Sequence, residues 1–133
     1  MKSLIESIDQ AIASDRLAWR REDTAITVGL WHGHQQRVHL EKHGDHYRFW
    51  SVVAGSAQVT ASDSGWRSLA YRAWRKNDLK ELVAFSFDRE DRLIGVIEQP
   101  AATLDRQELV LYINVLATEC DRFEYQLSGQ DRW

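Results

Sequence analysis

The stretch that decides the fold reads VAFSFDREDRLIGVI over residues 83–97 and DRQELVLYINVLATECDRFEYQL over residues 105–127. Its first part holds two short apolar runs, Val83–Phe87 and Leu93–Ile97, separated by a polar turn. In the first run the phenylalanines alternate with smaller residues, which is the period of a half-buried strand. The two runs therefore predict an antiparallel hairpin, and the second part predicts a long helix.

The predicted helix begins with a capping box. Asp105 can accept a hydrogen bond from a free helical N–H, and Glu108 can reach back to the N–H of Asp105. Leu111 and Val115 lie outside the main apolar face, so the helix is expected to be covered on more than one side. Because their exposure would create an apolar patch, we predict that they form a homodimer interface. The main face repeats at three- and four-residue spacing through Leu109, Tyr112, Ile113, Leu116, Cys120, Phe123 and Leu127.

The composition is that of one ordinary domain spanning residues 1–133, with 44% hydrophobic and 28% charged residues. Its lone cysteine, Cys120, excludes an internal disulfide framework and is expected to be a small buried hydrophobe. The net charge of −3 argues against a nucleic-acid-binding protein that relies on a basic surface. No targeting signal and no membrane-length apolar run is evident, so we expect a cytoplasmic protein without membrane contact.

The N-terminal segment predicts another capped helix. Ser3 and Glu6 have capping-box spacing, and the helix is expected to end near Arg20. Residues 20–23 are then expected to form a polar connection. The apolar face of this helix comprises Leu4, Ile5, Ile8, Ala11, Ile12 and Trp19.

The next segment predicts three antiparallel strands joined by short turns. Apolar residues alternate with polar ones around residues 26–30, 38–41 and 47–53. Gly33 and the sequence His-Gly-Asp at 43–45 are turn signals between them. This part of the chain is therefore a meander.

A helix is predicted from Trp66 to about residue 76. Its apolar residues, among them Trp66, Leu69, Ala73 and Trp74, share one face, and arginines lie on the other. Aromatic and basic residues on one helix could also stack nucleic-acid bases, but these tryptophans share a face with the apolar residues, away from most of the arginines. We therefore expect Trp66 and Trp74 to face the core. The full order of elements is α-β-β-β-α-β-β-α, with a twisted antiparallel sheet, which is an α+β domain.

Five segments of the chain form a recognisable pattern: Leu69-Ala-Tyr-Arg-Ala-Trp-Arg-Lys-Asn77, Val83-Ala-Phe-Ser-Phe-Asp88, Leu93, Leu104-Asp105 and Glu108-Leu109. With these segments the chain resembles the C-terminal half of the YbjN-like family, which shares the fold of type III secretion chaperones. The resemblance covers about residues 66–127. It implies a twisted antiparallel sheet with packed helices, commonly a homodimer, that binds other polypeptides without catalysis and without a cofactor.

All five histidines lie between positions 32 and 46, within the meander. Two imidazoles on one strand and a third on its neighbour can hold a transition metal, but His32-Gly-His34 is equally typical of a turn. No phosphate-binding loop, nucleophile elbow or catalytic triad spacing is present, so no enzyme is predicted. Two functions remain: a chaperone-like or adaptor protein that binds a protein or peptide, and a small-molecule- or metal-binding protein built on the His-rich meander.

The third predicted strand points to a partner-binding surface. Tyr47, Phe49 and Val53 form one face, whereas Trp50 lies on the other, so neither face is plainly polar. One face must meet the helices. The other presents Trp50, with Trp31 and His39 as expected neighbours on adjoining strands, and this composition is enriched at protein interfaces. A loop or a second copy of the chain could also cover these residues.

Overall fold

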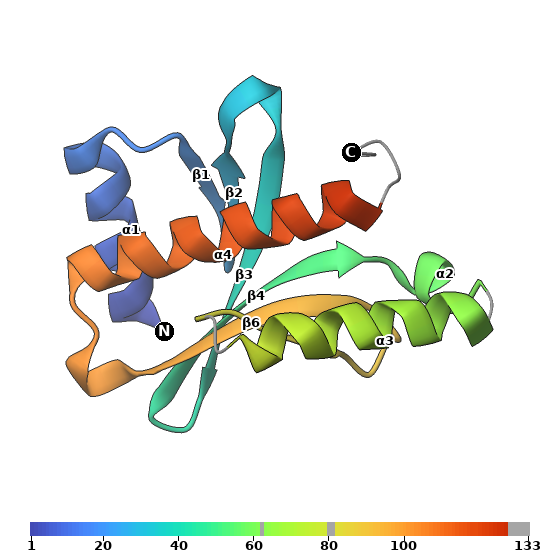
Figure 1. The fold of residues 1–133 in the computed structure, drawn as a ribbon. Helices are drawn as coiled ribbons and strands as arrows, with labels where there is room; N and C mark the ends of the chain where they lie inside the picture. Colours follow the sequence, from blue (N-terminus) through green and yellow to red (C-terminus); the bar gives the residue numbers. More distant parts are fainter. Residues whose placement is uncertain (62, 80–81, 128–133) are drawn as a thin grey trace.

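The computed structural model describes residues 1–61, 63–79 and 82–127 (Figure 1). It is an α+β fold, as predicted, and it keeps the predicted order of elements, with strand β1 and the short helix α2 in addition. No helix in these ranges is both long and apolar enough to cross a membrane. The helical segments are α1 (Lys2–Asp15), η1 (Trp31–Gly33), α2 (Ser56–Val59), α3 (Asp63–Asp78), η2 (Ala101–Thr103) and α4 (Arg106–Leu127).

The strands form one antiparallel six-stranded sheet in the order β1-β2-β3-β4-β6-β5. Pairing of β4 with β6, for example Phe49 with Ile97, joins the N-terminal meander to the C-terminal hairpin. The hairpin between β3 and β4 turns at Gly44, whose φ of +61° suits a residue without a side chain. The strands are β1 (Trp19–Glu22), β2 (Ala25–Gly29), β3 (Gln35–His43), β4 (His46–Ala54), β5 (Ala84–Phe87) and β6 (Leu93–Pro100).

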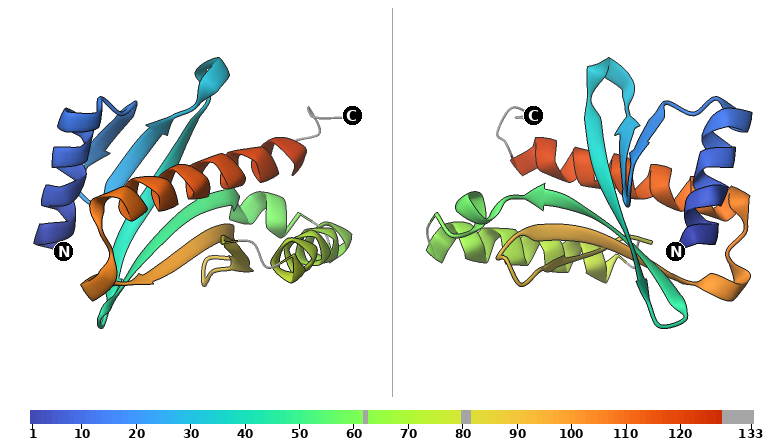
Figure 2. Two further views of the ribbon diagram at one scale, coloured as in Figure 1. Left: turned by 60° about the vertical axis from the view of Figure 1, so that its left-hand side comes forward. Right: turned by 180° about the vertical axis from the view of Figure 1, so that it is seen from behind.

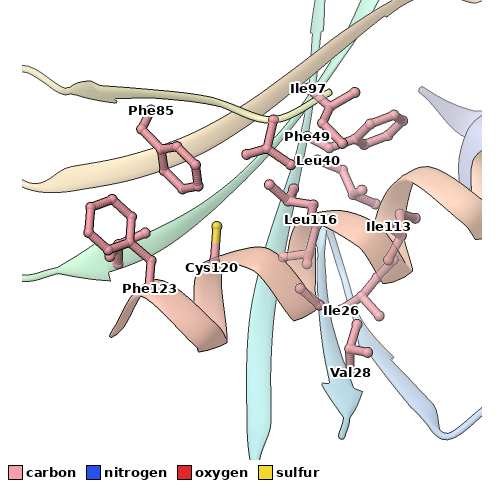
Figure 3. Close-up of a cluster of buried hydrophobic side chains, with 14 of the residues drawn as sticks. Ile26, Val28, Leu40, Phe49, Phe85, Ile97, Ile113, Leu116, Cys120 and Phe123 are labelled. Atoms are coloured by element: carbon pink, nitrogen blue, oxygen red, sulfur yellow. The ribbon is translucent and has the colours of Figure 1, made fainter. Parts of the chain in front are cut away.

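The core lies between one face of the sheet and helix α4, which crosses β3, β4 and β6 (Figures 1 and 3). The rings of Phe85 and Phe123 meet edge to face with centroids 5.0 Å apart. Gly95 faces Cys120, and a Cβ at position 95 would collide with the Cys120 sulfur. Most of the predicted apolar face of α4 is confirmed, although Tyr112 and Leu127 are only half-buried and Ala117, outside the predicted face, is fully buried. The other fully buried residues of α4 are Leu109, Ile113, Leu116, Cys120 and Phe123.

The start of α4 confirms half of the predicted capping box. The backbone N–H of Glu108 donates to Oδ1 of Asp105 at 2.8 Å. The carboxylate of Glu108, however, accepts a hydrogen bond from the Tyr112 hydroxyl at 3.2 Å, one turn along the helix. Asp105 therefore caps α4, while Glu108 orients a side chain on the helix surface.

The predicted N-terminal helix is wrong at both ends. It begins at Lys2, so Ser3 lies inside it and no side-chain cap is formed. It ends at Asp15, because Arg16 adopts a left-handed conformation with φ 53°. The residues expected to finish the helix and form a connection instead make edge strand β1, where the Trp19 indole donates to Asn114 Oδ1 of α4 at 3.1 Å.

The prediction that Trp66 and Trp74 face the core is also wrong. Their side chains are 48% and 60% exposed, whereas Leu69 and Ala73 are buried. Helix α3 packs on the edge strand β5 and therefore buries only a narrow stripe. The side-chain amide of Asn77 exchanges two hydrogen bonds of 2.8 Å with the backbone of Phe85 and so occupies the β5 edge.

Candidate functional site

The second face of the sheet, opposite α4, is the outer face. The right-hand view of Figure 2 shows this face, with strands in front of α4. Within the part of the chain that the structure describes, no helix covers it. Strand register aligns Val96, Trp50 and His39 in one row across β6, β4 and β3. Since β4 lies in the middle of the sheet, Trp50 occupies the centre of this face.

The side chain of Trp50 is held on three sides. Its indole stacks on the His39 imidazole with ring centroids 4.1 Å apart and planes 19° apart. The Arg92 guanidinium lies 5.2 Å from the ring centroid, within the range of a cation–π contact. The indole N–H donates to Oε1 of Glu41 at 3.1 Å. The predicted proximity of His39 and Trp50 is confirmed, and their role in partner binding stays a prediction.

The surroundings of His39 favour its neutral form. Partial burial lowers its pKa below 6.5, and the positive charges of Arg37 and Arg92 lower it further, against an opposing contribution from Glu41. A neutral imidazole can stack on Trp50 without competing with Arg92 for the indole. The environment therefore favours an uncharged His39–Trp50 pair at the centre of the outer face, with the charges of Arg92 and Glu41 directly beside it.

A shallow depression of about 890 Å³ borders Trp50 on the side of the β5–β6 turn. Arg92 closes this side by pairing with Asp88 through two contacts of 2.8 Å. Opposite it, Arg48 lies 3.6 Å from carboxylate oxygens of both Glu41 and Glu98. The arrangement is an apolar centre within a ring of paired charges, which is the layout of a protein-binding surface. Residues that line the depression include Glu41, Lys42, Arg48, Trp50, Phe87, Arg89, Arg92 and Ile94.

Trp31 does not join this group. The chain leaves β2 after Gly29 and forms the short helix η1, so Trp31 lies on no strand of the sheet. Its side chain is 78% exposed and lines a separate depression against the C-terminal half of α4, beside His34 and Tyr125. This second group was not predicted, although residues 118, 121, 122 and 125 follow helical spacing on α4.

The histidines of the meander are dispersed. His34 contacts Asp121 of α4 at 3.1 Å, and His39 lies in the middle of the outer face. His43 and His46 lie at the far hairpin end, each bonded to a neighbouring carboxylate. Among the described residues, no three His, Cys, Asp or Glu side chains form a group suited to a metal ion.

Two apolar surfaces are available for self-association. On α4, Leu111 is 54% exposed, while Val115 is half-buried against the core of its own chain. On α3, three aromatic residues are exposed, Trp66, Tyr71 and Trp74, here called the α3 stripe. Tyr71 and Trp74 stack with ring centroids 6.2 Å apart, whereas Trp66 stacks on Phe87 of β5 at 5.8 Å. The α3 stripe exposes three large aromatic residues, against one exposed leucine on α4, and it was not predicted.

Comparisons with known proteins agree with this architecture. No model of a known protein family matches the sequence, and no curated protein is similar to it in sequence. Among solved structures, YbjN from E. coli superposes with a TM-score of 0.64 at 9% identity, over 95% of this chain and 92% of that chain. The chain has the type III secretion chaperone fold.

Two further solved structures contain bound protein partners. The ExsC–ExsE complex matches with a TM-score of 0.62 at 12% identity, over 92% of each chain. The Yersinia pestis type III secretion chaperone SycH, in complex with a fragment of YscM2, matches with a TM-score of 0.56 at 11% identity, over 90% of this chain and 98% of that chain. At these identities the similarity is one of fold.

Proposed function

We propose that this chain is a non-enzymatic protein-binding module that acts as a homodimer and binds a segment of another polypeptide. The observation that carries the proposal is the uncovered outer face with Trp50 at its centre. Tryptophan and arginine dominate the binding energy of protein interfaces when they lie in a central, water-excluded position. The ExsC–ExsE and SycH–YscM2 structures support the idea that this fold is suited to binding polypeptides.

The partner segment should present an apolar side chain to Trp50 and polar groups to its border. The outer face offers Val96 and Val52 beside the indole, both half-buried, and charged side chains further out. Trp50 already stacks on His39 and bonds to Glu41, so its orientation is fixed before a partner arrives. A preorganised anchor loses less conformational entropy on binding than a mobile one.

For the homodimer we assign the α3 stripe as the principal contact and retain Leu111 and Val115 as the alternative. The stripe carries three large aromatic side chains, each 48% or more exposed. Leu79 and Leu82, exposed by 70% and 44%, follow α3 in the sequence and can extend the apolar area. Soluble monomers seldom expose apolar patches of this kind. Val115, in contrast, is partly buried against the core of its own chain and has less surface to offer a second copy.

Comparative capture tests the proposed binding surface while the partner is still unidentified. The wild-type chain and Trp50→Ala are immobilised separately and incubated with native lysate. The proteins that each chain retains are then quantified by mass spectrometry. Thr27→Ala, also on the outer face but on β2, is the matched control. We expect a protein retained by the wild type and by the control but depleted with Trp50→Ala. Equal retention by all three would refute the assigned surface.

A further inference from the structure

The depression beside Trp50 is large enough for more than one side chain of a partner. Its volume is about 890 Å³, near the upper end of the volumes that ligand-binding pockets enclose. Trp50, Phe87 and Ile94 supply its apolar part, and most of its other lining residues are charged. A short segment that enters the depression therefore meets charged side chains as well as the apolar part.

Every carboxylate among the described lining residues already has a partner in this chain. Asp88 accepts hydrogen bonds from the backbone N–H groups of Glu90 and Arg92, and it pairs with the Arg92 guanidinium at 2.8 Å. Glu90 lies 3.2 Å from the same guanidinium. Glu41 contacts the imidazole of His43 at 2.8 Å. The negative charge of the depression is therefore balanced within the chain.

Two of its cations have no such partner. The bases that line the depression are Lys42, Arg48, Arg89 and Arg92. Arg48 and Arg92 belong to ion pairs with carboxylates. Lys42 and Arg89 are exposed, and no carboxylate among the described residues forms an ion pair with either of them. The depression therefore carries an excess of positive charge.

The centre of the outer face has the same sign of charge. After burial, the charges of Arg37 and Arg92 are the main causes of the lowered pKa of His39, and the opposing effect of Glu41 is smaller than either. The positive field therefore extends from the depression toward β3. It contrasts with the net charge of −3 of the whole chain.

We propose that the partner segment is acidic, with an apolar side chain packed at Trp50 and Asp or Glu residues on either side of it that pair with Lys42 and Arg89. The inference rests on the proposed function, because it specifies the partner of the same surface. Lys42 belongs to β3 and Arg89 to the β5–β6 turn, so they flank the central strand that carries Trp50. Charges at the border of an interface select the partner and speed its association.

The test is a selection of random peptides displayed on phage against the immobilised chain. Phage that also bind Trp50→Ala are removed first, so that the retained peptides depend on Trp50. We expect these peptides to share an apolar residue flanked by Asp or Glu. Trp50-dependent peptides without this enrichment would overturn the inference and leave the proposed function standing. The absence of any Trp50-dependent peptide would count against the outer face as a peptide-binding surface, and so against both.

Synthetic versions of a selected peptide measure the contribution of charge. Replacing its acids by Asn or Gln keeps the shape, removes the charge and should weaken binding to the wild type about threefold to tenfold. The double variant Lys42→Glu, Arg89→Glu should prefer the neutral peptide. The control Lys2→Glu, Arg106→Glu makes the same change in net charge at the first residues of α1 and α4, and should discriminate like the wild type. Equal discrimination by both double variants would overturn the assignment of Lys42 and Arg89.

Discussion

The imidazole of His39 stacks on the indole of Trp50 across neighbouring strands, with ring centroids 4.1 Å apart. Burial and two nearby arginines keep the pKa of this imidazole below 6.5 in the folded chain. The folded chain therefore binds fewer protons than the unfolded chain as the pH falls through this region. The stability that depends on a neutral His39 is complete above about pH 6.5 and is lost as the pH falls through the lowered pKa.

The first prediction follows from this linkage. Between about pH 7.5 and about pH 5, the wild-type chain should lose more free energy of unfolding than His39→Gln, which cannot titrate at this position. Urea unfolding of both chains at the two pH values measures the difference. An identical loss in both chains would show that His39 does not carry this pH dependence.

The second prediction concerns the contact between Gly95 and Cys120. Gly95→Ala should destabilise the chain by about 1–3 kcal/mol, because the added methyl group collides with the Cys120 sulfur and makes tight contacts with Val83 and Phe85. Cys120→Ala should recover part of this loss in the double variant, since it removes the sulfur. Urea unfolding of the two single variants and the double variant gives the coupling energy. Strictly additive effects would contradict the contact.

The third prediction concerns the reactivity of Cys120. Burial raises the pKa of its thiol to about 12, so very little thiolate exists at neutral pH. A thiol-specific reagent such as DTNB should react with the folded chain far more slowly than with the chain unfolded in urea. The release of the coloured thiolate reports both rates. Modification of the native chain as fast as that of the unfolded chain would contradict the buried placement.

The fourth prediction concerns the homodimer. The double variant Trp66→Ser, Trp74→Ser should sediment as a monomer at micromolar concentration, because it removes most of the apolar area of the α3 stripe. Leu111→Ser is the matched comparison on α4 and should stay dimeric. The reverse result would assign the interface to α4, and a monomeric wild type would refute the dimer itself.

The sequence was sufficient to predict the hairpin of β5 and β6, the meander and α4, because in each the apolar period and the turn residues agree. It was insufficient where the same residues fit both the spacing of a helix and the alternation of a strand. Trp19 continues the three- and four-residue spacing of α1, yet Trp19–Glu22 pairs with β2 as an edge strand. The spacing of apolar residues does not predict the left-handed conformation of Arg16, which ends α1 and separates it from β1.

Burial of α3 and the position of Trp31 depend on tertiary structure. An amphipathic helix over a sheet would bury Trp66 and Trp74, but α3 packs on an edge strand and leaves both exposed. The pair His39 and Trp50 was predictable because strand register follows from the short turn between β3 and β4. The proximity of Trp31 and Tyr125 was not predictable, because it depends on where the η1 segment lies against α4 in the folded chain.

The central claim is that Trp50 anchors a polypeptide partner on the outer face. Its most direct test is the affinity of Trp50→Ala for the captured partner, measured by calorimetry together with the thermal midpoint. We expect a loss of about 2 kcal/mol in binding free energy, as for a buried interface anchor, with a nearly unchanged midpoint and with Thr27→Ala as an unaffected control. Wild-type affinity in Trp50→Ala, or a variant that no longer folds, would contradict the account.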